Sequence, residues 1–179
     1  MDGGPAQSEF KADVTVGVFS LSGWEIRLRT DFWNAYVLGD IIDMIRYASD
    51  RDFEQLSRYD KHICEAELRN CIKSKRILIM LSDDTLIGWL RFNLFWDNIP
   101  FMNMLYLLEG YRGKGYGTRL VGFWENEMLK NKYKMVLTST QSNERAQFFY
   151  RKMGYADCGA LLLPDEPLEI ILSKNLGQP

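Results

Sequence analysis

The chain has 179 residues and a formal net charge of −2, with 46% hydrophobic and 26% charged residues. This balance is typical of one globular domain with a single core rather than of a disordered chain. The charge provides no field that would hold a phosphate backbone, so general nucleic-acid binding is disfavoured. No run approaches the roughly 18 apolar residues that a membrane span requires, so no membrane partner is expected.

The cysteines and the single histidine narrow the chemistry further. Cys64, Cys71 and Cys158 are odd in number and have no CxxC spacing, so neither a disulfide framework nor a zinc site is expected. This use of cysteine is typical of a reducing compartment and predicts a cytoplasmic protein. His62 is the only histidine, and no G-x-S-x-G segment accompanies it. Sites with several histidine ligands are excluded, and we expect no metal and no serine-hydrolase triad.

The first half of the chain predicts a tail, a strand, two helices and three strands. Residues 1–23 are predicted to form a flexible tail, and residues 24–176 one folded domain. Alternating apolar and polar residues over 24–30 predict a half-buried strand. Apolar spacing predicts helices over residues 40–56 and 61–74. Short apolar runs separated by turn residues predict strands over 76–81, 86–96 and 101–108.

The second half predicts helices alternating with strands. Leu120, Trp124 and Met128 recur at helical spacing, which predicts an amphipathic helix over residues 117–130. Residues 134–138 form a predicted strand, and a helix from Ala146 to Met153 is predicted to end at Gly154. Two closing strands are predicted over residues 160–163 and 169–172. The strand–helix–strand connections require parallel pairing, so the fold class is α/β (α+β) with a mixed sheet.

A glycine-rich loop lies between the strand predicted over 101–108 and the helix that follows it. Gly113, Gly115 and Gly117 occupy alternate positions, and Arg112 and Lys114 add positive charge. Backbone N–H groups without neighbouring Cβ atoms can converge on one anion at a helix N-terminus. The loop therefore predicts a site for a phosphate or pyrophosphate.

Two common phosphate-binding motifs do not fit this loop. A Walker A loop requires Lys and Ser or Thr after its last glycine, but Tyr116 and Gly117 follow Gly115 here. The dinucleotide fingerprint G-x-G-x-x-G fails because the third glycine comes one residue early. A tight turn that uses glycine only for its geometry is the remaining structural alternative.

Two segments together resemble the GNAT superfamily of acyl-CoA-dependent N-acetyltransferases. Arg112, Gly115 and Gly117 match its R-x-x-G-x-G pyrophosphate loop, and residues 143–155 resemble its N-x-x-A-x-x-F-Y-x-K-x-G-F/Y segment at the expected distance. The resemblance covers most of the chain beyond the tail. It implies a single-domain fold with a mixed central sheet and helices on both faces, and acetyl-CoA as co-substrate.

The resemblance also assigns site residues. Backbone N–H groups of the loop and the following turn would hold the pyrophosphate: Arg112, Gly113, Lys114, Gly115, Tyr116, Gly117 and Thr118. Leu105 and Leu107 would pair with the pantetheine arm, and Asn143 matches a position that contacts it. Tyr150 matches the general acid, and a phenol with an ordinary pKa of about 10 is protonated at neutral pH. Its apolar spacing with Ala146 and Met153 alone would indicate a core tyrosine.

The general base and the acceptor are less defined. The strand before the loop contains no carboxylate, so we expect proton removal through water, assisted by Asp97 or by a carboxylate of the first helices. The predicted acceptor is a small-molecule amine. Acidic residues could attract it or simply form a solvated helix face: Asp40, Asp43, Asp50 and Asp52, together with Trp96 and Asp97. Polar residues 138–142 could line its site.

Three alternatives stay open at this point. The chain could transfer acetyl groups to protein N-termini or lysines, it could be a catalytically weak CoA-binding regulatory module, or it could bind another nucleotide phosphate. The missing carboxylate before the loop favours the regulatory reading. A homodimer is one possible assembly.

Overall fold

The computed structural model describes residues 20–21, 24–25, 34–38 and 41–177, and the chain divides into two compact units, residues 1–32 and 33–179. In the first unit β1 (Ser20–Leu21) pairs antiparallel with β2 (Trp24–Glu25). The strand predicted over 24–30 coincides with β2 at its start, and residues 26–30 lie outside the described residues. The predicted tail also lies outside them, except for β1.

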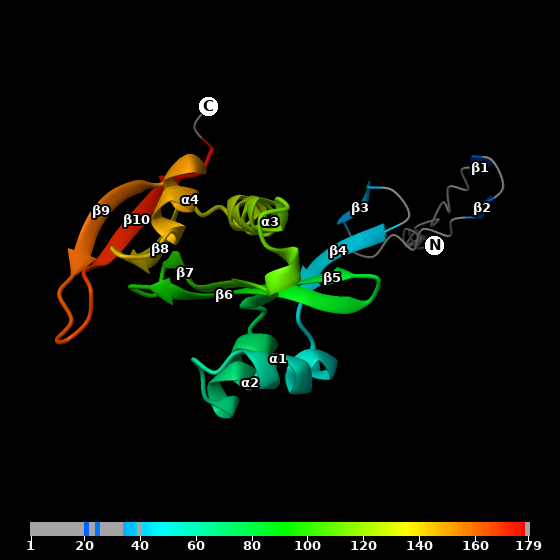
Figure 1. The fold of residues 1–179 in the computed structure, drawn as a ribbon, viewed down its shortest axis with the longest axis horizontal. Helices are drawn as coiled ribbons and strands as arrows, with labels where there is room; N and C mark the ends of the chain where they lie inside the picture. Colours follow the sequence, from blue (N-terminus) through cyan, green and yellow to red (C-terminus); the bar gives the residue numbers. More distant parts are fainter. Residues whose placement is uncertain (1–19, 22–23, 26–33, 39–40, 178–179) are drawn as a thin grey trace, which may run out of the picture. The chain divides into compact units, whose positions relative to one another are not determined.

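The second unit is built on one eight-stranded sheet with the order β3-β4-β5-β6-β7-β8-β10-β9 (Figure 1). Its strands are β3 (Asn34–Leu38), β4 (Ile41–Tyr47), β5 (Ile77–Ser82), β6 (Thr85–Phe95), β7 (Ile99–Leu107), β8 (Met135–Gln141), β9 (Ala156–Leu161) and β10 (Glu169–Asn175). Only β7 and β8 pair in parallel; the other neighbours are antiparallel. The predicted mixed sheet is confirmed.

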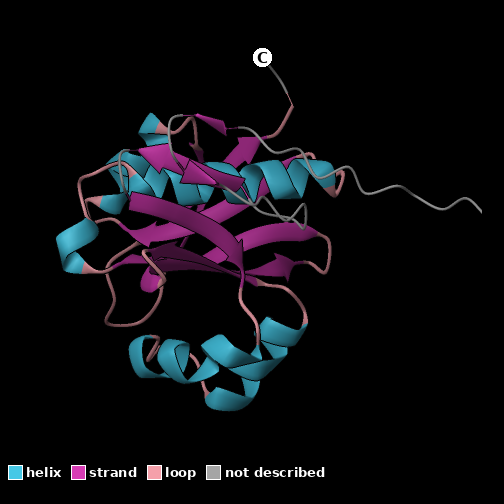
Figure 2. Cartoon of the chain, turned by 90° about the vertical axis from the view of Figure 1, so that its right-hand side faces the viewer, coloured by secondary structure: helices cyan, strands magenta, loops and turns pink. Residues whose placement is uncertain are grey.

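Helices cover both faces of this sheet, as predicted (Figures 1 and 2). They are the 3₁₀ helices η1 (Asp50–Asp52) and η2 (Glu109–Tyr111) and the α-helices α1 (Phe53–Tyr59), α2 (Glu65–Lys73), α3 (Tyr116–Lys130) and α4 (Ala146–Lys152). α1 and α2 lie on one face, and α3 and α4 lie on the other. Every residue of β5 is buried because helices cover it from both sides.

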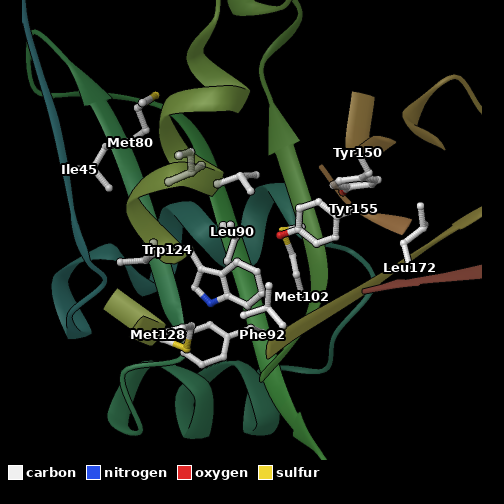
Figure 3. Packing of buried hydrophobic residues seen from close by; sticks show 14 of the residues in the cluster. Ile45, Met80, Leu90, Phe92, Met102, Trp124, Met128, Tyr150, Tyr155 and Leu172 are labelled. Atoms are coloured by element: carbon white, nitrogen blue, oxygen red, sulfur yellow. The ribbon is translucent and has the colours of Figure 1, made fainter. Parts of the chain in front are cut away.

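Each face of the sheet has its own hydrophobic cluster. On one face Trp124 and Met128 of α3 pack with Leu90, Met102 and residues of β10 (Figure 3). On the other face α1 and α2 pack on Trp89 and β5. The apolar stripe that predicted the helix over 117–130 is therefore the stripe that α3 buries.

The helix predicted over residues 40–56 is confirmed only from Asp50 onward and is wrong over residues 41–47. Residues 41–47 form strand β4, and helical structure begins only at Asp50. The apolar spacing misled because β4 is covered on both faces: Ile45 packs in the α3 cluster and Met44 against the α1 cluster. A strand buried on both sides has no polar stripe to reveal its two-residue period.

The remaining elements lie close to their predicted positions. The helix predicted over 61–74 is α2, the strands of the predicted hairpin series are β5, β6 and β7, and residues 134–138 fall within β8 apart from Lys134. α4 ends as expected, with Gly154 at a φ of +88°. The strand predicted over 160–163 lies earlier in the chain than expected. β9 spans Ala156–Leu161, and Leu162 lies in the following loop. β9 is an exposed edge strand of small and polar residues, so its sequence lacks a strong apolar run.

Candidate active site

The central feature of the site is the point where β7 and β8 separate. Their parallel pairing consists of Phe101 with Leu137 and Met102 with Thr138, and it ends there. Opposite β6 the register skips Asn103, since Arg91 pairs with Met104 and Phe92 with Met102. This β-bulge bends β7 at the separation point. Residues 104–107 keep their pairing with β6 but leave their other edge open toward β8.

The glycine-rich loop closes one end of this opening. After η2 the chain turns back, and Arg112 Nε donates a hydrogen bond of 2.8 Å to the carbonyl oxygen of Leu107, the last residue of β7. The guanidinium carbon of Arg112 lies 5.1 Å from the ring centroid of Tyr106. Gly113 and Gly115 have φ angles of +73° and +86°, which side chains other than glycine rarely adopt. Arg112 thus anchors the loop to the end of the open strand.

The loop leads directly into the N-terminus of α3. Gly115 is the N-cap residue, and the N–H of Arg119 donates the first helical hydrogen bond, to the carbonyl of Gly115 at 3.1 Å. The amides before Arg119 have no acceptor inside the helix. The first turn of α3 carries no acidic residue, and Cβ atoms built on Gly113 and Gly115 meet no protein atom within 4 Å. This arrangement fits a pyrophosphate, because free amides, the helix dipole and space are present together.

Tyr150 reaches the same opening from α4. Its side chain is buried, at 6% exposure, and its ring packs on Phe149 and Tyr155 with centroid distances of 5.2 and 5.7 Å (Figure 3). Burial raises its pKa to about 12; a side-chain hydrogen bond with Thr138 lowers the pKa, and the charge of Glu144 raises it. The Tyr150 hydroxyl is therefore protonated at neutral pH and lies beside the last β7–β8 pair.

Two residues that the sequence did not assign belong to this part of the site. Thr138 donates from Oγ1 to the carbonyl of Met102 at 3.1 Å and also bonds Tyr150. Glu144 accepts a 2.7 Å hydrogen bond from Thr140 Oγ1, and its charge acts on Tyr150. Both lie within segments that the sequence had marked as possible acceptor lining or motif. The pairing of β8 with β7 and the packing of α4 bring both residues close to Tyr150, which the sequence alone does not show.

The structure brings most of the predicted cofactor residues together. Leu105 and Leu107 lie on the open section of β7, and residues 112–118 form the loop and first turn of α3. Asn143 is exposed in the turn between β8 and α4. These segments surround the opening at the carboxyl ends of the two strands.

Asp97 is not brought to this group. It lies with Trp96 at the tip of the β6–β7 hairpin, exposed, and both residues have positive φ angles, 62° and 48°. Asp97 precedes Asn103 by six residues, which corresponds to about 20 Å along an extended strand. The hairpin tip is at the opposite end of β7 from the glycine loop.

Asp50 and Asp52 are the acidic residues before α1 whose side chains the structure describes, and their surroundings differ. Asp52 is buried and receives two hydrogen bonds of 2.6 Å from Arg46. Burial raises its pKa, but the bonds from Arg46 and Ser49 outweigh burial and lower it. Asp50 is exposed on η1, Asp40 lies outside the described residues, and so does the side chain of Asp43. Asp52 therefore belongs neither to an acidic acceptor surface nor to a solvated helix face, because it is buried in its pair with Arg46.

The structure also contains a cavity of about 240 Å³ beside the Arg46–Asp52 pair. It is lined by Met44, Arg46, Arg51, Asp52, Gln55, Leu81 and Asp84. None of these residues belongs to β7, β8 or the glycine loop, so the cavity is separate from the opening.

Two features are absent from the part of the chain that the structure describes. Within residues 20–21, 24–25, 34–38 and 41–177, no group of three or more His, Cys, Asp or Glu side chains is placed to hold a metal ion. In the same part of the chain, no helix is both long and apolar enough to cross a membrane.

Comparison with known proteins identifies the class. The sequence model of the acetyltransferase (GNAT) family matches residues 24–155. No curated protein sequence matches the chain. The chain belongs to the GNAT acetyltransferase family, as the two motifs predicted. Acetyl transfer with a CoA-based co-substrate is the reaction of this class.

Solved structures share the fold at low sequence identity. A GNAT acetyltransferase from Bacillus cereus is 21% identical with a TM-score of 0.63, and the match covers 76% of this chain and 99% of that one. An aminoglycoside 6'-N-acetyltransferase complexed with coenzyme A is 17% identical with a TM-score of 0.64, covering 75% and 98%. Naa50 from Arabidopsis thaliana, bound to the bisubstrate analogue CoA-Ac-MVNAL, is 16% identical with a TM-score of 0.62, covering 74% and 97%.

Proposed function

We propose that this protein transfers an acetyl group from acetyl-CoA to the primary amine of a small molecule by direct attack on the thioester. The observation that carries the proposal is the common location of three features: the open edge of β7, the glycine loop at the N-terminus of α3, and the buried hydroxyl of Tyr150. Acetyl-CoA, when bound, supplies a thioester carbonyl that a neutral amine can attack.

The loop and the open strand would hold and orient the co-substrate. Amides of residues 112–118 would bind the pyrophosphate, and the backbone groups of Leu105 and Leu107 would pair with the extended pantetheine arm as a neighbouring strand would. An N–H group on the open edge of β7 can also donate to the thioester oxygen, on which negative charge develops. Asn143, at the start of the turn before α4, would contact the same arm.

Tyr150 would act as the general acid. Its raised pKa keeps the phenol protonated at neutral pH, and its bond with Thr138 directs the hydroxyl to the point where β7 and β8 separate. A proton donor at this position can neutralise the departing thiolate. Glu144 is close enough for its charge to raise the pKa of Tyr150, so it favours the protonated form.

Removal of the amine proton would run through water. Asp97 was the predicted assistant, but its distance along β7 leaves Glu144 as a carboxylate that is placed beside the opening. Asp97→Asn and Glu144→Gln should be compared in the pH profile of kcat/KM. A profile changed only by Glu144→Gln would assign the assisting role to Glu144, and one changed only by Asp97→Asn would restore Asp97.

The decisive experiment is release of free CoA thiol from acetyl-CoA over a panel of amines. We expect amine-dependent release, together with a larger thermal shift for acetyl-CoA than for ATP or NAD. Binding of acetyl-CoA without thiol release from any amine would instead indicate a CoA-binding regulatory module. The absence of metal, the cytoplasmic location and a homodimeric assembly remain proposals that accompany this function.

A further inference from the structure

The two faces of the β7–β8 opening differ in what covers them. α3, α4 and Tyr150 occupy one face, together with the residues assigned to the co-substrate. α1 and α2 lie on the other face but pack on Trp89 and β5, not on β8 or β10 (Figure 1). If the proposed function is correct, an acceptor amine has access to the opening from this second face.

One rim of this access is a row of three aromatic rings. Trp89 stacks on Tyr106, with a centroid distance of 4.6 Å, and Tyr59 at the end of α1 stacks on Trp89 at 6.1 Å. Trp89 is buried, but Tyr59 and Tyr106 are 40% and 37% exposed. Tyr106 belongs to the open section of β7, so this aromatic rim borders the opening directly. Among the described residues, the buried Trp89 Nε1 has no hydrogen-bond partner.

The other rim is the loop that joins β9 to β10. The leucines of this loop and Leu161, the last residue of β9, are exposed: Leu161 50%, Leu162 88%, Leu163 49% and Leu168 38%. The loop is fixed against the end of β8, because Leu168 accepts a 2.8 Å hydrogen bond from the Ser142 N–H and Gln141 Nε2 donates to Glu166 at 2.8 Å. In Figure 1 it extends to the side of the sheet on which α1 and α2 lie.

These rims hold an unusual share of the exposed apolar surface. Of the ten large hydrophobic residues that are exposed in the described part of the chain, six lie on them: Tyr59, Tyr106, Leu161, Leu162, Leu163 and Leu168. Exposed apolar groups concentrated beside a reaction site mark a binding surface. The leucine rim also carries Asp165 and Glu166, and Glu166 accepts a hydrogen bond from Gln141.

We infer that the acceptor carries its amine on an apolar or aromatic carbon body, which lies between the tyrosines of the aromatic rim and the leucines of the leucine rim. This inference rests on the proposed function and names the substrate class of the same site. Apolar burial supplies the binding energy, and the amine is the only polar group that must reach the opening.

The test compares amines of similar size with different carbon bodies. Phenylethylamine and hexylamine are compared with putrescine and glucosamine in the thiol-release assay, and peptides beginning with Leu are compared with peptides beginning with Ser. We expect kcat/KM to be at least about 10-fold higher for the apolar member of a pair. The peptide pair shows whether the apolar amine is a free molecule or a chain N-terminus. Equal rates, or a preference for putrescine, would overturn the inference.

Variants of the leucine rim separate recognition from chemistry. Leu162→Ser with Leu163→Ser should raise KM for the apolar amine about 10-fold and leave the Kd for acetyl-CoA unchanged. Leu129→Ser removes a similarly exposed leucine from the C-terminal end of α3 and should change neither. An unaltered KM in the double variant contradicts the inference. If no amine releases thiol while acetyl-CoA still binds, the proposed function itself is wrong. Failure of the inference about the acceptor alone would leave thiol release intact.

Discussion

The hydroxyl of Tyr150 is hydrogen-bonded to the side chain of Thr138, the residue at which the pairing of β7 and β8 ends. This bond connects α4 with the separation point of the sheet. Tyr150 is 6% exposed: its ring belongs to the core, and its hydroxyl lies beside Thr138 at the end of the β7–β8 pairing. Thr138 also bonds the Met102 carbonyl, so the same side chain orders both strands.

Tyr150→Phe tests the acid directly. The ring and its contacts are kept, and only the proton donor is lost, so kcat should fall by about 10² to 10⁴-fold with little change in the Kd for acetyl-CoA. Thiol release and calorimetry measure the two quantities. Tyr47→Phe is a control, because Tyr47 is half-buried against the same hydrophobic cluster and its hydroxyl contacts Glu127 rather than the opening. An unchanged kcat in Tyr150→Phe would remove this residue from the mechanism.

The buried tyrosines predict loss of stability in alkali. The pKa values of Tyr47 and Tyr150 are raised to about 12, mainly by burial, and that of Tyr155 is also raised. Between pH 10 and 12 the unfolded chain therefore loses protons that the folded chain keeps. The free energy of unfolding is constant below about pH 10 and falls as pH rises through this window.

Urea unfolding at pH 8, 10 and 11 measures the effect. The contribution of Tyr150 is about 3 kcal/mol at most, from the difference between its folded and ordinary pKa. Tyr150→Phe should flatten the fall in stability above pH 10. A wild-type stability that stays constant to pH 12 would show that these hydroxyls ionise freely in the folded protein.

Gly115→Ala tests the pyrophosphate site proposed at the glycine-rich loop. The φ of +86° makes alanine unfavourable by about 1 to 2 kcal/mol, although its Cβ would meet no protein atom. The methyl group would instead occupy the space proposed for the pyrophosphate, so the Kd for acetyl-CoA should rise by more than the stability loss explains. Gly122→Ala lies in the middle of α3 with free space around its Cβ and should stabilise the helix slightly. Equal Kd values for both variants would contradict pyrophosphate binding at the glycine-rich loop.

Whether a helix or strand could be predicted from the sequence depends on the residue pattern that marks it. α3 was predicted because its buried stripe repeats at helical spacing and a glycine loop marks its start. β4 was missed because helices cover both its faces, which removes the alternation that identifies a strand. β5 is also buried on both sides, but it was predicted because its apolar run is short and ends at the turn residues that follow Leu81.

The candidate site could be predicted only in part, because only some of its residues are neighbours in the sequence. The loop residues are contiguous, so spacing alone brings them together. The Tyr150–Thr138 bond and the distance of Asp97 depend on strand register and on the bulge at Asn103, which no local pattern records. Asp97 is near the opening in sequence but lies beyond the hairpin end of β7.

Gly88→Ala tests the close approach of β6 to the open strand. Gly88 pairs with Leu107, and a Cβ at this position would lie 2.4 Å from Leu107 Cδ2 and 2.7 Å from the Tyr106 carbonyl oxygen. The backbone of β7 would have to move, which costs about 1 to 3 kcal/mol. Because Leu107 also accepts the bond from Arg112, the Kd for acetyl-CoA should rise as well. Gly159→Ala, on the exposed strand β9 with open space, should alter neither quantity.

The buried ion pair behind the aromatic rim is the last test. Arg91 Nε lies 3.0 Å from Asp60 Oδ2, with 8% and 1% of the two side chains exposed, and Asp60 Oδ1 accepts the His62 N–H at 3.1 Å. Asp60→Ala leaves the Arg91 charge buried without this partner and should reduce the free energy of unfolding by about 3 to 5 kcal/mol.

A double variant and an exposed pair make this result specific. Asp60→Leu with Arg91→Met removes both charges and should recover much of the lost stability in urea unfolding. Asp157→Ala breaks the exposed pair with Arg151 and should barely move the urea midpoint. Because Asp60 follows Tyr59, Asp60→Ala should also raise KM for an apolar amine more than it changes the Kd for acetyl-CoA. If KM stayed constant while stability fell, the end of α1 would have no part in acceptor binding.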